Sequence, residues 1–134
     1  MYTIFFDGAC FPNPGECAYG VSLQKNGIEI DCTSCKVGRG TNNKAEYHGL
    51  IGAIQMATAH SIKSCKIMSD SLLIVNQMNK TWVTKDSDLQ LLQNVARSMI
   101  ENSDCDFTLI HIKRHFNTRA DNLAKTALSN KERE

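Results

Sequence analysis

Apolar and polar residues follow one another along the chain in runs that predict five strands and four helices. The apolar run Thr3–Phe6 ends on Asp7, and the Gly, Pro and Asn residues that follow predict a turn. Asn26-Gly27 stands between two further strand-like runs, at 19–24 and 28–36, which is the strongest short-range signal for a hairpin. The remaining runs predict strands at 65–69 and 107–113, and helices at about 42–60, 72–78, 86–100 and 117–129. Side-chain oxygens at 41–43 can cap the first of these helices, and Asp86 or Ser87 can cap the third.

This order of elements predicts an α/β fold. A hairpin start followed by helices and strands in alternation implies a five-stranded mixed sheet, in which three antiparallel strands are followed by two strands parallel to the first, with helices on both faces. In such sheets the functional crevice lies beyond the carboxyl ends of the parallel strands. Asp7 and Asp70 each follow such a strand, so we expect both at that edge.

The composition fits one globular domain, which we expect to span residues 1–134 with a frayed polar tail at 130–134. The 15 Lys and Arg residues nearly balance the 14 Asp and Glu residues, so any binding of nucleic acid depends on local arrangement. No apolar run approaches the roughly 20 residues that span a bilayer, and the amino terminus lacks a signal-peptide pattern. We therefore expect a cytoplasmic protein without membrane contact, and the start at Met1 favours a free-standing one.

The six cysteines are expected to be reduced thiols in such a protein. Cys32 and Cys35 have the spacing of a zinc or redox pair, but residues three apart on a strand point to opposite faces. No second pair supplies further ligands, so we expect neither a metal nor a redox role for them.

Four acidic residues stand near the ends of predicted elements, namely Asp7, Glu46, Asp70 and Asp121. Glu46 shares the apolar helix face that packs on the sheet. Three of the four also have a local structural interpretation: Glu46 as the partner of an Asn43 N-cap, Asp70 as an N-cap, and Asp121 as a complement to a helix dipole. The sheet topology nevertheless allows all four to gather at one edge.

Four carboxylates in one place repel one another unless cations lie between them. Two divalent cations would neutralise the cluster, and hard oxygen ligands suit Mg²⁺ or Mn²⁺ better than zinc. Two such ions roughly 4 Å apart form the arrangement used for in-line phosphoryl displacement. The carboxylates therefore predict a metal-dependent nuclease.

The segments around these residues resemble the type 1 ribonucleases H. The matching segments cover nearly the whole chain in the family's order, at 7–10, 13–15, 19–20, 41–46, 69–71, 117–121 and 123–124. The resemblance implies an endonuclease that hydrolyses the RNA strand of RNA–DNA hybrids and leaves 5′-phosphate and 3′-hydroxyl ends. It also implies that two Mg²⁺ or Mn²⁺ ions are held by Asp7, Glu46, Asp70 and Asp121. No obligatory protein partner is implied, and we expect a monomer.

The resemblance further assigns contacts to the hybrid. They fall on Cys10, Asn13, Thr41, Asn42 and Asn43, with Trp82 close to the DNA strand and Arg114 near a phosphate. Small polar side chains and backbone amides can bind 2′-hydroxyls and phosphates without reading base sequence, and an aromatic ring can pack on a sugar or base. The structural alternatives are a satellite core position for Trp82 and a turn role for Asn13.

Three features depart from the family pattern. The connector at 79–87 is too short for the basic protrusion of some members, and no separate amino-terminal hybrid-binding module is present, so we expect weaker and more salt-sensitive binding. Many members place a mobile histidine in a loop before the last aspartate. Here His115 precedes Asp121 by a short segment, so either His115 or Arg114 takes that catalytic role, or both only contact phosphate.

Three other classes of protein are alternatives to this assignment. The related proofreading-type exonucleases would have an acid at position 9, where this chain has Ala9. A non-catalytic hybrid-binding module would be favoured by the loss of a carboxylate, and none of the four is missing. A nuclease domain of a retroelement polyprotein remains an open alternative.

Overall fold

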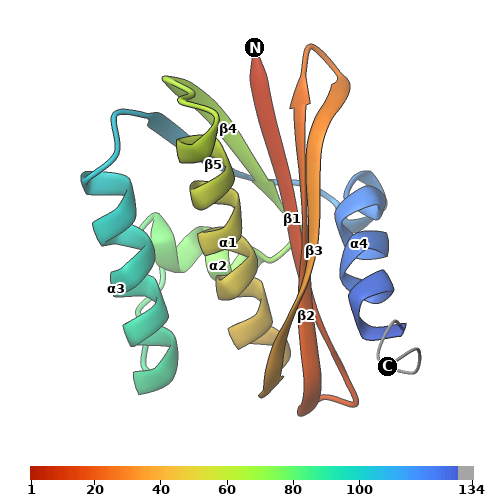
Figure 1. Ribbon diagram of the computed structural model, residues 1–134. Helices are drawn as coiled ribbons and strands as arrows, with labels where there is room; N and C mark the ends of the chain where they lie inside the picture. The colour runs from red at the N-terminus through yellow and green to blue at the C-terminus, as the bar shows by residue number, and fades with distance from the viewer. Residues whose placement is uncertain (130–134) are drawn as a thin grey trace.

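The chain forms a five-stranded sheet with helices packed against it (Figure 1). The structure, a computed structural model, describes residues 1–129, and the tail expected to be frayed, 130–134, lies outside the described residues. In chain order the elements are β1 (Tyr2–Phe11), β2 (Gly15–Lys25), β3 (Ile28–Gly40), α1 (Asn42–Ala59), β4 (Ser64–Ser69), α2 (Leu72–Met78), α3 (Ser87–Glu101), β5 (Asp106–His111), a short 3₁₀ helix η1 (Arg114–Phe116) and α4 (Thr118–Ser129).

The strand directions confirm the predicted mixed sheet. Its order is β3-β2-β1-β4-β5, with antiparallel pairing among the first three strands and parallel pairing of β1 with β4 and of β4 with β5. Helix α4 covers one face, and α1, α2 and α3 lie on the other (Figure 1). The carboxyl ends of β1 and β4 therefore meet at one edge, as expected for a functional crevice.

The predicted hairpin joins β2 to β3 at Asn26-Gly27. Both residues have positive φ, 53° and 82°, as a two-residue turn compatible with strand twist requires. The register then pairs Lys25 with Ile28.

The first three strands are longer than the pattern predicts. β1 continues past Asp7 and pairs with β2 as far as Phe11↔Glu16, whereas its parallel pairing with β4 ends at Phe5↔Met68. The prediction that the first strand ends near Asp7 is therefore wrong for the pairing with β2, which continues to Phe11. Only the pairing with β4 ends before Asp7. The third strand was predicted to end at residue 36, but β3 continues through the glycine-containing segment 38–40. Gly38 has φ 82° and lies beside a shift in the β2–β3 register, which lets the pairing continue beyond it.

The helix caps differ from two of the local interpretations. The N-caps are Thr41, Ser71 and Asp86, whose side chains accept from the backbone N–H groups three residues on, at 3.4, 3.2 and 3.0 Å. Asp86 was among the predicted caps, but the assignments of Asn43 with Glu46 and of Asp70 to capping are wrong. Both carboxylates are thus free to serve another purpose.

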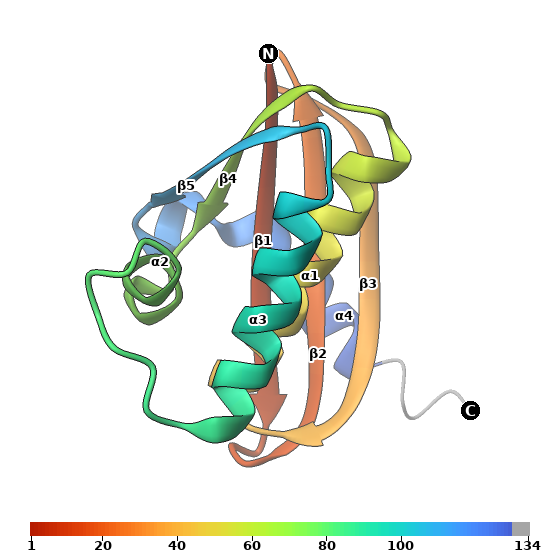
Figure 2. The same cartoon turned by 90° about the vertical axis from the view of Figure 1, so that its left-hand side faces the viewer.

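Helix α1 forms the centre of the core. It lies between the sheet and α3 (Figure 2), and for that reason it is buried on more than one face. Tyr47, Leu50 and Ile54 are 0–1% exposed. On the other face α4 approaches β2 at Gly20, where a Cβ would overlap the backbone of Ala120. Among residues 1–129, no helix combines the length and apolar character needed to cross a membrane.

Candidate active site

The site begins where β1 separates from β4. After Phe5 the parallel pairing stops while β1 continues along β2, and the first turn of α1 packs at this point. Gly8 makes the approach possible, because a Cβ there would overlap the backbone of Ala45 and Glu46. This close contact brings the side chain of Glu46 to Asp7.

Three of the four predicted carboxylates form a cluster. Ligand oxygens of Asp7, Glu46 and Asp70 all lie within 4.8 Å of one another. Asp7 and Glu46 are buried, at 6% and 7% exposed, and the Gly8 N–H donates to Glu46 Oε1 and, at 3.0 Å, to Asp7 Oδ1. Asp121, in the first turn of α4, lines the same cavity as these acids from the other face of the sheet, and its Oδ2 lies 2.9 Å from Lys125 Nζ.

Crowding and burial make these carboxyl groups hard to ionise. Burial, together with the charges of Asp70 and Asp121, raises the pKa of Asp7 to about 7. Burial and the neighbouring Asp7 raise the pKa of Glu46 well above its usual range. Burial also raises the pKa of Asp70, although hydrogen bonding to Asn117 and the charge of Arg114 oppose the rise. Bound cations would remove this strain, because they favour the ionised forms.

An open cavity of about 420 Å³ surrounds the carboxylates. Its wall includes all four acids, two cationic side chains and several predicted hybrid contacts, namely Asp7, Glu46, Asp70, Asp121, Arg114, Lys125, Cys10, Asn42 and Asn43. Asn13 and Thr41 line a second groove that continues from Asn42 and Asn43 along the start of α1. The acids and most of the predicted polar contacts therefore form one continuous surface.

Two predicted residues lie away from this cavity. Trp82 is 45% exposed and lines a separate groove of about 380 Å³ with residues of α2 and α3. Its exposure argues against the core-anchor alternative. His115 is exposed in η1, its ring lies 4.1 Å from that of Phe116, and it is absent from the cavity wall.

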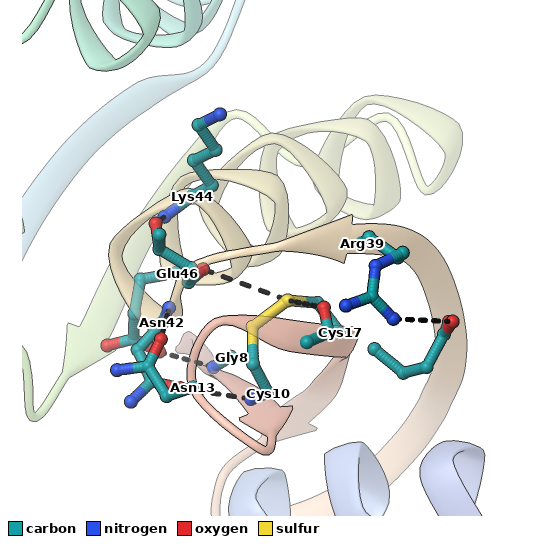
Figure 3. The surroundings of a disulfide bond; sticks show 11 residues. Gly8, Cys10, Asn13, Cys17, Arg39, Asn42, Lys44 and Glu46 are labelled. Carbon is teal, nitrogen blue, oxygen red and sulfur yellow. Dashed lines mark hydrogen bonds and ion pairs between the residues drawn. A yellow bond between two sulfur atoms is a disulfide. The ribbon is translucent and has the colours of Figure 1, made fainter.

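Side chains and backbone join the turn after β1 to the start of α1 (Figure 3). The Cys10 N–H donates to Asn42 Oδ1 at 3.0 Å, and the Asn42 N–H donates to Asn13 Oδ1 at 3.0 Å. Asn13 is thus more than a turn residue, because its amide oxygen orients the start of α1. These bonds hold the surface beside the carboxylates in one arrangement.

The expectation of reduced thiols is wrong for two cysteines. Cys10 and Cys17 form a disulfide that joins opposed positions of β1 and β2 (Figure 3), whereas Cys32, Cys35, Cys65 and Cys105 are free. The Cys10 side chain is consequently a disulfide sulfur and not a thiol donor to the hybrid, although its backbone remains at the cavity. Cys32 and Cys35 do face opposite sides of β3, as expected, since Cys32 contacts Arg119 and Cys35 contacts Tyr19.

Two residues of the site were missed by the sequence reasoning. Lys125 follows Asp121 by four residues, and this helical spacing is a signal that such pairs lie side by side. Cys17 stands as far after the turn at 12–15 as Cys10 stands before it, which indicates opposed positions in a hairpin. Reduced thiols are the usual state of cysteines in a chain without a signal-peptide pattern, and this pair departs from that rule.

Comparison with known proteins supports the same assignment. A family model described as reverse transcriptase-like matches residues 5–127. Ribonuclease HI of Halobacterium salinarum is 37% identical over 92% of this chain, and its crystal structure superimposes with a TM-score of 0.92, covering 96% of this chain and 98% of that one. A ribonuclease H of Chlorobium phaeobacteroides is 30% identical, covering 96% of this chain and 95% of that protein. The structure of LC11-RNase H1 in complex with an RNA/DNA hybrid has a TM-score of 0.92 at 28% identity, covering 97% and 98% of the two chains.

The similarity extends over almost all of this chain but not over all of every relative. The chain spans 62% of the length of the Halobacterium protein and 34% of the length of the mycobacterial relatives that it matches. The Chlorobium relative, by contrast, is covered almost from end to end. From the family match, this full-length relative and the shared fold, we conclude that the chain belongs to the type 1 ribonuclease H family.

Proposed function

We propose that this chain is a metal-dependent endonuclease that hydrolyses the RNA strand of RNA–DNA hybrids and leaves 5′-phosphate and 3′-hydroxyl ends. The observation that carries the proposal is the cluster of Asp7, Glu46 and Asp70, whose ligand oxygens lie within 4.8 Å, with Asp121 on the same cavity. The hybrid bound in the LC11-RNase H1 structure supports the choice of substrate.

The donor set fits two Mg²⁺ or Mn²⁺ ions. Every candidate ligand is a carboxylate, a hard oxygen donor, and the elevated pKa values of Asp7 and Glu46 express a charge density that divalent cations would relieve. We assign both ions to Asp7, Glu46, Asp70 and Asp121. When bound, such a pair activates the attacking water and stabilises the leaving oxygen.

Other residues around the site orient its carboxylates and bring positive charge to the cavity. The Gly8 N–H orients Glu46 and Asp7 toward each other. Arg114 and Lys125 bring positive charge to a cavity that otherwise carries acids, and we assign them to phosphate groups of the hybrid. Asn13, Thr41, Asn42 and Asn43, together with the backbone at Cys10, form the polar surface that we assign to the hybrid backbone.

Trp82 and His115 take more distant parts in this proposal. The exposed indole of Trp82 is assigned to the DNA strand, where an aromatic ring can pack on sugar or base. His115 keeps the proposed role of a loop histidine near the last aspartate, but Arg114 is the better placed of the two because it reaches the cavity. We further propose that the enzyme acts as a monomer in the cytoplasm.

A substrate panel tests the proposal. Purified protein is incubated with RNA–DNA hybrid, duplex RNA, duplex DNA and the single strands, each with Mg²⁺, with Mn²⁺ and with EDTA. We expect cleavage of the RNA in the hybrid alone, only with metal, and loss of nearly all activity in Asp7→Asn. Equal cleavage of all substrates would indicate a general nuclease, and wild-type activity in Asp7→Asn would refute the assignment of the site.

A further inference from the structure

Asn117 lies between η1 and α4 and is only 1% exposed. A buried amide is costly unless its polar atoms are bonded, so its place calls for a physical account. The residue stands in the segment that resembles the family's last motif, and its contacts show what the amide does there.

The side chain of Asn117 reaches two of the strands that carry carboxylates. Its Nδ2 donates to the backbone oxygen of Phe6 at 2.8 Å, across 111 positions of sequence. Phe6 precedes Asp7 and is the first residue of β1 beyond the parallel pairing with β4. The amide thus holds β1 where the sheet no longer holds it to β4. The same side chain opposes the rise in the pKa of Asp70, the acid that follows β4, and so acts on that carboxyl group as well.

The backbone of Asn117 bonds to the backbone of Asp121, the residue that carries a third carboxylate. Its carbonyl oxygen accepts the Asp121 N–H at 3.1 Å and so begins the hydrogen-bonding pattern of α4. Its own N–H donates to the Arg114 oxygen at 2.9 Å, which ties η1 to the same point. Glu46, the fourth acid, is oriented separately by Gly8.

We propose that Asn117 is a positioning residue of the metal site, whose amide and backbone set the relative places of Asp7, Asp70 and Asp121. The inference rests on the proposed two-cation function and deepens it. The amide suits the role because one NH₂ group can donate to a carbonyl and to a carboxylate at once. A leucine would fill the space without donating, and an ionised aspartate would add a further negative charge. The amide oxygen of Asn117 is buried and accepts no hydrogen bond among residues 1–129, so the NH₂ group carries the interaction.

Metal affinity tests this role independently of catalysis. Isothermal titration calorimetry measures the Kd for Mn²⁺ of the wild type, Asn117→Ala and Ser22→Ala. Circular dichroism verifies that each protein is folded. Ser22 is a matched control because it is also fully buried and also makes a side-chain hydrogen bond. Its hydroxyl donates to Glu29 at 2.7 Å, and Glu29 is not one of the four acids of the site. Loss of a residue that orients ligands typically weakens metal binding about 10- to 100-fold, which is the result expected for Asn117→Ala. Ser22→Ala should stay within about threefold of wild type.

The outcomes separate this inference from the proposed function. If wild type binds Mn²⁺ and Asn117→Ala binds it within about threefold as tightly, the positioning role is refuted while the metal site stands. If wild type itself binds no Mn²⁺, the metal site fails, and the inference fails with it.

A second measurement on the unaltered protein applies even if Asn117→Ala does not fold. In ¹H–¹⁵N spectra, the side-chain NH₂ resonances of Asn117 should shift on saturation with Mg²⁺. Those of Gln93, a buried amide bonded to the Gln77 oxygen at 2.8 Å in α2, should not. If the Gly8 N–H shifts and the Asn117 NH₂ group does not, Asn117 does not sense the metal site and the inference is overturned.

Discussion

The substitution Asp7→Asn should do two opposite things: it should abolish hydrolysis and stabilise the metal-free protein. Asp7 is buried among other acids, and its pKa is raised from 3.8 to about 7. A group whose pKa is higher in the folded than in the unfolded state contributes its full stability only at a pH below its pKa in the unfolded state. Its contribution to stability is therefore lost as the pH rises from about 4 through about 7.

The magnitude follows from the same pKa values. At pH 8, a rise from 3.8 to about 7 corresponds to a cost of about 4 kcal/mol in the free energy of unfolding, and at pH 4.5 to about 1 kcal/mol. An asparagine carries no charge at either pH but loses some of the native hydrogen bonding. We therefore expect Asp7→Asn to be about 2–4 kcal/mol more stable than wild type at pH 8, and similar to wild type at pH 4.5.

Urea unfolding in EDTA, followed by far-ultraviolet circular dichroism at both pH values, measures this difference. Asp104→Asn serves as the control, because the Asp104 side chain is 91% exposed and its substitution should change stability by no more than about 0.5 kcal/mol. Added Mg²⁺ should stabilise wild type and leave Asp7→Asn nearly unchanged. A variant no more stable than wild type at pH 8, or a gain of equal size at both pH values, would refute the reasoning.

Three further predictions follow from the packing, the disulfide and the separate groove. Gly8→Ala should cost about 3 kcal/mol or more and abolish activity, because a Cβ there meets the first turn of α1; Gly27→Ala, in an open turn at φ 82°, should cost only about 1–2 kcal/mol in the same unfolding assay. Dithiothreitol should lower the free energy of unfolding by about 2.5 kcal/mol, the loop-entropy value for the short loop that the Cys10–Cys17 disulfide closes. A variant with alanine at both positions should not respond, and an equal response of that variant would show that the effect does not come from this disulfide. Trp82→Ala should raise KM for the hybrid about five- to a hundredfold with little change in kcat, as lost stacking on one base predicts, and a fall in kcat alone in steady-state kinetics would contradict that assignment.

Local patterns were sufficient for most of the fold. The Asn26-Gly27 turn, the α2 boundaries at Leu72 and Met78 and the Asp86 cap depend on interactions within a few residues, which the sequence displays directly. The strand ends were predicted less well. Gly38 is a local breaker, yet β3 continues through it, because hydrogen bonds to β2 outweigh the local preference.

The carboxylates show where local reasoning stops. Viewed alone, Glu46 and Asp70 have the positions of capping residues, and only the structure shows that Thr41 and Ser71 perform the capping. Gly8 has no side chain, so α1 can pack closely enough for the Gly8 N–H to donate to Glu46. The orientation of Glu46 therefore depends on a glycine that lies 38 positions earlier in the sequence.

The sequence by itself determined the order of elements, the mixed sheet and the identity of the four acids, because periodicity and motif spacing act over short distances. Only the tertiary structure decided that β1 leaves β4 after Phe5, that Cys10 is bonded to Cys17, and that the Asn117 amide donates to the Phe6 oxygen. Each of these features depends on atoms from distant segments meeting within bonding distance. Close packing fixes such distances, and no local pattern in the chain encodes them.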